Sequence, residues 1–379
     1  MSALPLFPVT TVGSWPRPHA LLAGQRAHRA GEISHARFEQ TVSDAVRETV
    51  QAQHRAGVDL VTDGEQARDN FYSFVAEKLD GVRLMTLAEM LDHVEDKEGF
   101  SRLLDTLDVP AFAIRNPTCV GPLRLREPLA LGDLERLRRF TDRPVKVTLP
   151  GPYLLTRAMW VPEVTRQAYP SKEALGEDVV TLLRDEIARL VAAQADFIQL
   201  DEPVLTELVF SKGQTRTFMC ASLAARGDPS EELRWALDML HQVLGTAGST
   251  RTGLHVCRGN WSRDERTLLR GSYAPLATWL AQAPVTQLVL EYATPRAGEV
   301  ITTAGKELGL GVVNPRTEIV ERVETIVQRV EAALRVVPRE SVFLNPDCGF
   351  GTFSARAVND ADTAERKLAV MVEAARRLR

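Results

Sequence analysis

The chain has 379 residues, which is long for one ordinary domain but usual for a single α/β barrel. Its hydrophobic fraction of 44% and charged fraction of 25% are typical of globular enzymes. The formal net charge of −4 argues against nucleic acid or an acidic membrane surface as the main partner. No apolar run reaches membrane-spanning length, and the N-terminus lacks the basic and apolar regions of a signal peptide. We therefore expect a cytoplasmic protein.

Short apolar runs that end in Gly, Pro, Asp or Asn recur along the chain, and amphipathic stretches fill most of the gaps between them. In chain order, the expected strands are 9–14, 58–64, 144–151, 197–203, 252–257, 287–292, 308–314 and 342–348. The clearest helices are expected at 35–56, 172–195 and 317–336. Gly57 and Ser171 are suitable caps for the first two. The alternation and the count predict an α/β fold of the (βα)8 TIM-barrel type.

The alternation is interrupted between the second and third expected strands, over roughly residues 79–142. The run 119–125 follows an Asn116-Pro117 turn signal between two apolar stretches, so we expect a hairpin outside the barrel. One or two helices would complete this insertion. Since no linker or repeat divides the chain, we predict one barrel domain over residues 1–379.

Polar residues and glycines stand at the end of nearly every expected strand. In a barrel of this type the carboxyl ends of the strands face the active site, so their convergence predicts a catalytic cavity. The positions are Gly13-Ser14, Asp63-Gly64-Glu65, Gly151, Asp201-Glu202, His255 with Cys257, Glu291, Asn314 and Asp347-Cys348.

His255 and Cys257 are two positions apart, so both side chains point to the same side of an extended strand. Imidazole and thiolate are ligands that zinc prefers. For this pair alone, a buried strand histidine beside an incidental cysteine is the simpler interpretation. Glu291 and Cys348 at two other strand ends add weight to the zinc hypothesis, and both interpretations stay open at this point. The remaining cysteines, Cys119 and Cys220, are expected to be free thiols.

Three segments resemble the zinc-binding sequence of the cobalamin-independent methionine synthase family: T-G-L-H-V-C-R-G-N, Q-L-V-L-E-Y-A and V-F-L-N-P-D-C-G-F. The segments T-T-V-G-S-W-P, D-G-E and Q-L-D-E-P are similar to further motifs of the family, so the resemblance extends from Thr10 to Gly349. It implies that zinc is bound by His255, Cys257, Glu291 and Cys348.

The same resemblance implies how an amino-acid substrate is bound. Val12, Gly13 and Ser14 would bind its carboxylate through backbone amides and a hydroxyl, and Glu65 and Asp201 would bind its ammonium group. Taken alone, D-G-E is also consistent with a helix start after a strand, and D-E-P with a plain turn. Their position on one barrel rim favours the binding role.

The implied reaction is methyl transfer to a zinc-bound thiolate, converting homocysteine to methionine. Zinc coordination deprotonates a thiol that would otherwise stay largely protonated at neutral pH. Glu291 is the ligand that we expect to loosen as the thiol enters. The alternative enzyme is a zinc-dependent thiol alkyltransferase of the epoxyalkane:coenzyme M type, but an acceptor without an amino group would not use Glu65 and Asp201. Uroporphyrinogen decarboxylase shares the barrel without needing a metal, and a purely structural zinc is the non-catalytic alternative.

Two departures from the family pattern leave the methyl donor open. The chain resembles the C-terminal catalytic barrel alone, as in short members, whereas in the full-length enzymes both halves help bind folate. Where the family has D-x-H-S with a histidine as general acid, this chain has Asn314 and Arg316. Arginine is a poor proton donor, so another acid serves or the donor needs no protonation. The candidates are methyltetrahydrofolate and a methyl corrinoid, the latter with a corrinoid protein as a partner.

Several further residues have two interpretations. Arg316 is a surface residue at a helix start or a contact to an anionic substrate, and Arg258 and Asn260 are turn residues or contacts of the same kind. Three aromatic residues either pack near the barrel mouth or line the donor pocket: Trp15, Tyr153 and Trp160.

Overall fold

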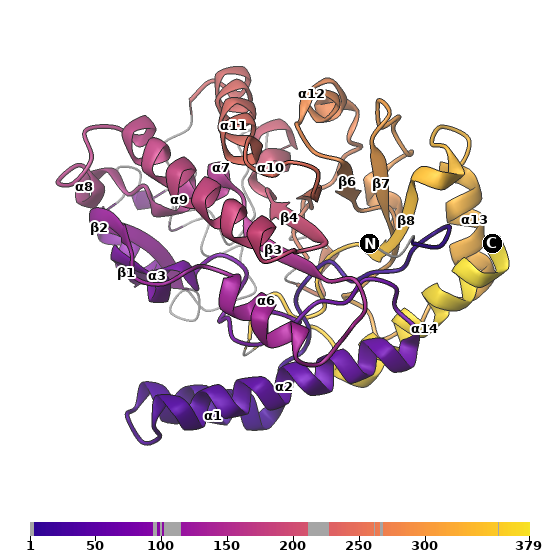
Figure 1. Cartoon of the computed structure of the whole chain (residues 1–379). Coiled ribbons are helices and arrows are strands. Elements are labelled where there is room, and N and C mark those ends of the chain that lie inside the picture. Colours follow the sequence, from indigo (N-terminus) through magenta and orange to yellow (C-terminus); the bar gives the residue numbers. More distant parts are fainter. Residues whose placement is uncertain are drawn as a thin grey trace.

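The computed structural model describes residues 4–93, 97–98, 101, 115–210, 227–260, 262–265, 268–354 and 356–379. Helices surround a group of parallel strands (Figure 1). The strands are β1 Leu79–Thr86, β2 Arg115–Leu125, β3 Lys146–Pro150, β4 Phe197–Asp201, β5 Arg251–Val256, β6 Gln287–Leu290, β7 Glu307–Val313 and β8 Val342–Pro346. The α-helices are α1 His19–Arg29, α2 His35–Ala56, α3 Val75–Lys78, α4 Leu87–Met90, α6 Leu131–Arg138, α7 Pro152–Met159, α8 Pro162–Thr165, α9 Lys172–Ala192, α10 Val204–Phe210, α11 Pro229–Leu244, α12 Ala277–Gln282, α13 Val323–Ala333 and α14 Ala361–Leu378. Short 3-10 turns lie at Leu91–His93, Ala274–Leu276, Pro295–Ala297 and Arg339–Ser341.

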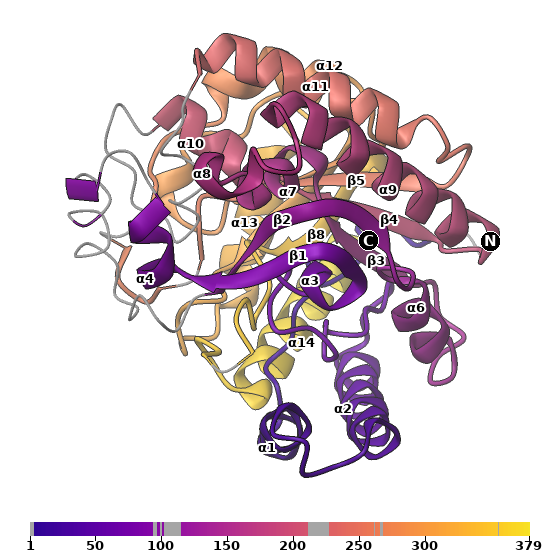
Figure 2. The same cartoon turned by 90° about the vertical axis from the view of Figure 1, so that its left-hand side faces the viewer.

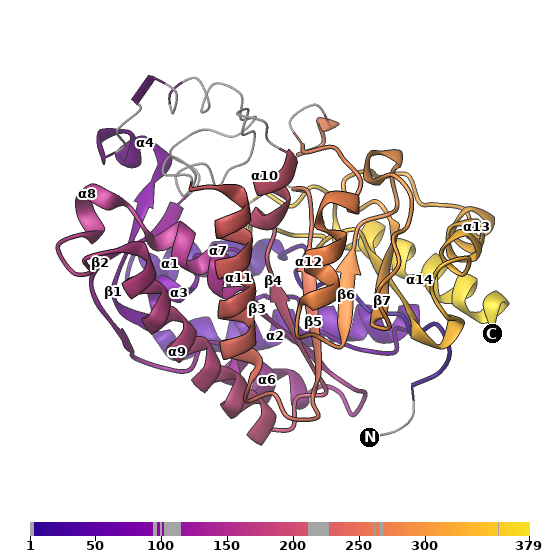
Figure 3. The same cartoon turned by 90° about the horizontal axis from the view of Figure 1, so that it is seen from above.

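Six strands form one parallel sheet in the order β3-β4-β5-β6-β7-β8. Seen from above, helices α9, α11 and α12 lie outside these strands (Figure 3). The strands are buried along almost their whole length, as expected when both faces of a parallel sheet are covered. The register pairs Pro150 with Asp201 and Asp201 with His255, so the carboxyl ends of neighbouring strands lie level. This alignment brings polar residues that are far apart in the sequence to one edge of the sheet.

Two short segments connect the outer strands of this sheet. Val9 forms a parallel bridge with Leu344 in β8, Thr10 with Leu60, and Val61 with Val145 just before β3. All eight expected strand positions therefore occur in the expected order, but two of them form single bridges instead of strands. A fully closed barrel of eight strands stays a prediction.

The long helices follow their capping residues. Helix α2 has the predicted bounds; the Ser34 side chain accepts a hydrogen bond from the Arg37 amide, and Gly57 ends the helix with a φ of 87°. The prediction for 317–336 was too long, because α13 covers only Val323–Ala333. The carbonyl oxygen of Thr317 accepts from the Asn359 side chain and that of Ile319 accepts from Lys367, so this stretch is held by side chains instead of helical bonds.

The segment between Val61 and β3 contains an antiparallel pair outside the parallel sheet. Figure 2 shows β1 and β2 as long neighbouring arrows, and their register pairs Leu79 with Leu125 and Thr86 with Arg115. The predicted turn at Asn116-Pro117 is wrong, since both residues lie inside β2. The side-chain amide of Asn116 donates to the carbonyl of Ala158 at 2.6 Å, which ties this strand to α7 instead of reversing the chain.

In the part of the chain that the structure describes, no helix combines the length and the apolar character needed to cross a bilayer. Cys119 is a buried free thiol, as expected, and its sulfur donates to the carbonyl of Gly121. Cys220 lies outside the described residues.

Candidate metal centre and active site

Three side chains form a compact group of metal-ligand type at the carboxyl ends of β5 and β8. A ring nitrogen of His255 and the sulfur atoms of Cys257 and Cys348 all lie within 4.8 Å of one another. Ligands of a tetrahedral zinc ion lie about 3.3–3.8 Å apart, so small side-chain movements would complete such a site. The Nδ1 atom of His255 lies 3.2 Å from the carbonyl oxygen of Val289, while Nε2 is buried and has no hydrogen-bond partner among the described residues. This leaves Nε2 available as a ligand.

The electrostatics of the group favour thiolate formation. A hydrogen bond from Cys348 and the neighbouring His255 lower the pKa of Cys257 to about 5, although burial opposes the shift. Donation to Cys257, together with burial, places the pKa of Cys348 well above its usual range. Burial also opposes the charge on His255, but Cys257 and the carboxylates of Asp201 and Glu291 outweigh it and raise the pKa of the imidazole to about 9. These contacts stabilise one thiolate at Cys257, and a metal ion bound at Nε2 of His255 would replace the imidazole proton there.

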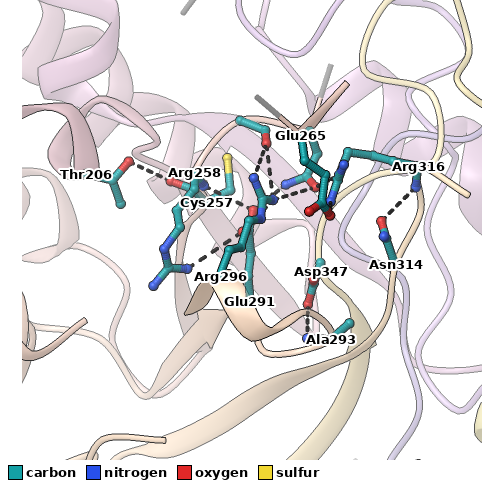
Figure 4. Close-up of polar contacts among 12 residues, drawn as sticks. Thr206, Cys257, Arg258, Glu265, Glu291, Ala293, Arg296, Asn314, Arg316 and Asp347 are labelled. Carbon is teal, nitrogen blue, oxygen red and sulfur yellow. Dashed lines mark hydrogen bonds and ion pairs between the residues drawn. The ribbon is translucent and has the colours of Figure 1, made fainter. Parts of the chain in front are cut away.

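Glu291 follows β6 but does not belong to this group of three. Its Oε1 accepts hydrogen bonds from the backbone amide of Arg258, at 3.0 Å, and from the side-chain amide of Asn260. Its Oε2 accepts from Arg296 at 2.9 Å. The fourth predicted ligand thus lies outside the group of three, and both of its carboxylate oxygens are bonded to other residues (Figure 4).

The three candidate ligands open onto a cavity at the carboxyl ends of the strands. Seven of the nine predicted site residues line it, and Gly13 and Glu291 do not. The lining is formed by Val12, Ser14, Glu65, Phe71, Asp201, Pro203, Glu207, His255, Cys257, Arg258, Gly259, Asn260, Leu269, Cys348, Gly349 and Thr352. The cavity therefore joins the metal group to the residues predicted to bind an amino acid.

Glu65 is held in an unusual backbone conformation with a φ of 53°, which is uncommon for a residue other than glycine. Its amide donates to Oδ1 of Asp63, and its Oε1 accepts from the hydroxyl of Thr148 at 2.9 Å. Its Oε2 is buried and has no hydrogen-bond partner among the residues that the structure describes. A buried carboxylate oxygen without a donor is costly, so this atom is suited to bind a cationic group of a ligand.

Asp201 lies at the end of β4, and two buried side chains hold its carboxylate in place through successive hydrogen bonds. Its Oδ1 accepts a 2.8 Å hydrogen bond from the amide of Gln199, and Oε1 of Gln199 accepts from Lys146 at 3.1 Å. Burial raises the pKa of Asp201 to about 7, against the lowering influence of His255. A ligand ammonium group beside this carboxylate would favour its charged form.

The loop that contains Val12, Gly13 and Ser14 meets the loop after β8. The amide of Phe350 donates to the carbonyl of Ser14, and a side chain on Gly349 would come closer than 3.0 Å to the Ser14 hydroxyl. The amides of residues 12–14 donate no hydrogen bond to backbone within the described part of the chain. Amides without a backbone partner and a hydroxyl at one turn are suited to bind a carboxylate.

Comparisons with known proteins show the family and the fold of this chain. The family model described as cobalamin-independent synthase, catalytic domain, matches residues 7–377. The chain belongs to this family. The methionine synthase of Saccharolobus solfataricus is 30% identical over 98% of this chain and 95% of its own length. The 5-methyltetrahydropteroyltriglutamate–homocysteine methyltransferase of Mycolicibacterium paratuberculosis is 27% identical over 99% of this chain, but over only 44% of its own length. A solved B12-independent methionine synthase from a Shewanella species, in complex with selenomethionine, has a similar fold, with a TM-score of 0.73, 22% identity and coverage of 99% and 98%.

The two positions that depart from the pattern of the cobalamin-independent synthase family, Asn314 and Arg316, lie outside the cavity lining. Arg316 is buried; its Nε donates to Oδ1 of Asn260 at 3.0 Å, and its NH2 group donates to Glu265 at 2.7 Å. Asn314 accepts from the Arg316 amide. The surface interpretation of Arg316 is therefore wrong, and its guanidinium is bonded to protein side chains.

Two groups of residues with open interpretations differ in whether they line the cavity. Arg258 and Asn260 line the cavity, whereas the three aromatic candidates for a donor pocket do not: Trp15, Tyr153 and Trp160. These aromatic residues are buried, and Tyr153 donates its hydroxyl proton to Glu232 at 2.7 Å. Their positions agree with the packing interpretation.

Sequence reasoning missed several residues that position the candidate site. Gln199 could have been found, because it lies two positions before Asp201 and therefore on the same face of β4. Thr148 occupies the corresponding place in β3. Arg296 follows β6 in a 3-10 turn, and no motif of the sequence indicated its contact with Glu291.

Proposed function

We propose that this protein is a zinc-dependent methyltransferase that converts homocysteine to methionine, built as a single closed (βα)8 barrel. The observation that carries the proposal is the cavity shared by two kinds of group. His255, Cys257 and Cys348 provide thiolate-rich metal ligands, and Glu65 and Asp201 provide carboxylates for an ammonium group. A structural metal site has no need of an adjoining substrate cavity.

The metal ligands in this proposal are His255, Cys257 and Cys348, with Glu291 as the exchangeable fourth. The buried Nε2 of His255 without a partner and the lowered pKa of Cys257 support this assignment. Zinc bound there would supply thiol activation, since coordination keeps a substrate thiol in its nucleophilic thiolate form. The chain fixes the tautomer of His255 through the Val289 carbonyl, which accepts from Nδ1.

The amino-acid part of the substrate would be held by the opposite wall of the cavity. Glu65 offers its unbonded Oε2, and Asp201 offers a carboxylate held in place by Gln199. Two carboxylates offset and orient one ammonium group. The amides of residues 12–14 and the Ser14 hydroxyl would receive the carboxylate. This recognition favours an amino-acid thiol over a sulfonate-bearing acceptor such as coenzyme M.

The methyl donor in this proposal is a methyl corrinoid or a methyltetrahydrofolate. A folate nitrogen must be protonated to leave. Arg316 is unsuited to supply this proton, because a guanidinium is a poor proton donor and this one is bonded to Asn260 and Glu265. A methyl corrinoid needs no such proton, and a corrinoid protein would then be the partner that presents it at the cavity mouth.

The proposal is tested by two measurements on the purified protein. Zinc content should be about one ion per chain, and homocysteine should yield methionine with at least one donor of a panel. The panel contains methylcobalamin, methyltetrahydrofolate with one or several glutamates, and S-methylmethionine. Zinc-loaded protein that makes no methionine from any donor would contradict methyl transfer to homocysteine and favour the thiol alkyltransferase.

A further inference from the structure

The carboxylate of Glu291 occupies a binding site made of protein groups. Its exposed fraction is 1%, and both oxygens are bonded: Oε1 to the Arg258 amide and the Asn260 side chain, Oε2 to Arg296. The guanidinium of Arg258 lies 3.7 Å from Oε2 and is stacked on Tyr273. Because these donors are themselves buried, the folded chain holds them around the carboxylate.

Asn260 cannot turn its amide around in this arrangement. Its Oδ1 accepts hydrogen bonds from two guanidinium groups, from Arg296 at 3.0 Å and from Arg316 at 3.0 Å. Because the side-chain oxygen of Asn260 faces the two guanidinium groups, its NH2 group points toward Glu291 and donates a hydrogen bond to Oε1. Arg316 therefore acts on Glu291 through Asn260 and is a positioning residue.

The charge balance favours occupation of the site by a carboxylate. Arg296 and Arg258 are 1% and 0% exposed, and their nearest carboxylate partner in the described residues is Glu291. A buried cation without a partner is strongly unfavourable, so these two arginines attract a carboxylate whenever Glu291 is released. Arg316 has its own partner, Glu265. Of the three arginines, Arg258 and Arg296 therefore depend on Glu291 for their negative partner.

We propose that Arg296 and Asn260 form a second binding position for the Glu291 carboxylate. When the substrate thiol replaces Glu291 at the metal, the released carboxylate binds at this second position. This inference rests on the proposed function. The two positions compete for one carboxylate, so the donors at the second position lower the free-energy cost of ligand exchange. A thiol then enters without leaving a buried carboxylate unpaired.

The competition makes a prediction with a definite sign. In Arg296→Met the second position is weakened, so Glu291 should stay at the metal. The affinity for zinc should rise roughly tenfold and the affinity for homocysteine should fall by a similar factor, the size typical of groups that support metal ligands. Zinc affinity is measured by competition with a chelating dye. Homocysteine binding is measured by the change in the visible absorption of the Co²⁺-substituted protein, without any turnover.

Four further variants make the test specific. Arg296→Lys should restore both affinities in part, because it keeps the charge. Asn260→Ala should shift them in the same direction as Arg296→Met, and serves if that variant does not fold. In a Glu291→Gln background, Arg296→Met should change neither affinity. Arg251→Met is the matched control, since it removes an arginine–carboxylate pair with Glu307 at the opposite end of β5.

A folded Arg296→Met protein whose zinc affinity is unchanged or lower would overturn the inference, as would an equal effect in the Glu291→Gln background. These results differ from a failure of the proposed function. Failure of the proposed function would appear in the unmodified protein, as absence of bound zinc or of methionine formation. Failure of the inference would appear in the variants, while the unmodified protein binds zinc and forms methionine.

Discussion

Phe350 donates a 2.9 Å backbone hydrogen bond to the carbonyl oxygen of Ser14. This bond joins the loop after the first bridge segment to the loop that carries Cys348, and the ring of Phe350 meets Trp15 edge-on at 5.6 Å. The predicted carboxylate-binding turn and one metal ligand are thus parts of one packed unit. A substitution in either loop should therefore shift the position of the other loop.

Gly349→Ala tests this junction. A Cβ at position 349 would lie closer than 3.0 Å to the hydroxyl of Ser14, so Ser14 must move. We expect the KM for homocysteine to rise roughly tenfold, because about one hydrogen bond to the charged carboxylate is lost, while bound zinc is retained. Gly132→Ala is the control, since nothing lies within 4 Å of a Cβ at that position. Equal kinetics of the two variants would contradict the role of Ser14.

Asp201→Asn should raise the KM for homocysteine roughly 10- to 100-fold, the usual effect of losing a hydrogen bond to a charged group. Gln199 and the fold around it are retained, so zinc content should not change. The discriminating measurement repeats the kinetics with 4-sulfanylbutanoate, a homocysteine analogue without the amino group. If the variant loses as much activity toward this analogue as toward homocysteine, Asp201 does not bind the ammonium group.

Cys257→Ser and Cys348→Ser should each lose bound zinc and methionine formation, because a hydroxyl is a much poorer zinc ligand than a thiolate. Metal content is measured on the purified variants by atomic spectroscopy. Cys119→Ser is the matched control: this thiol is also buried, but it bonds to the carbonyl of Gly121 away from the cavity. Full zinc content in either of the first two variants would refute the ligand assignment.

Lys146→Met should change the pH dependence of stability. Burial lowers the pKa of Lys146 to about 7, although Asp201 and Glu65 oppose the shift, whereas an unfolded lysine titrates near about 10.4. Between these values the unfolded chain binds more protons, so this residue makes stability rise with pH, by up to about 1.4 kcal/mol per pH unit. The stabilisation is present above the unfolded pKa and is lost as the pH falls through about 7.

The measurement is the free energy of unfolding in urea between pH 7 and 10 for both proteins. The difference between them should grow with pH in favour of the unmodified chain, as its lysine becomes neutral in both states. Parallel pH profiles would show that Lys146 keeps an ordinary pKa in the folded protein.

The sequence alone determined the elements whose signals are local. Helix α2 has the predicted bounds because an N-cap at Ser34 and a left-handed Gly57 act within one turn of its ends. The six strands of the sheet follow from buried apolar runs that end in polar residues. Spacing on β5 and the positions at strand ends grouped His255, Cys257, Glu291 and Cys348 in one metal-site hypothesis. The ligand atoms of all but Glu291 lie within 4.8 Å of one another.

Tertiary structure decided what depends on contacts between distant segments. The Asn116-Pro117 pair looked like a turn, but the bond from Asn116 to Ala158 and the pairing with β1 keep it extended. Arg316 gave no local signal of its role, because its partners Asn260 and Glu265 come from the loop after β5. The position of Glu291 also depends on contacts between distant segments. The sequence predicted that Glu291 is a metal ligand, yet two buried arginines and Asn260 provide a competing set of donors that only the folded chain assembles.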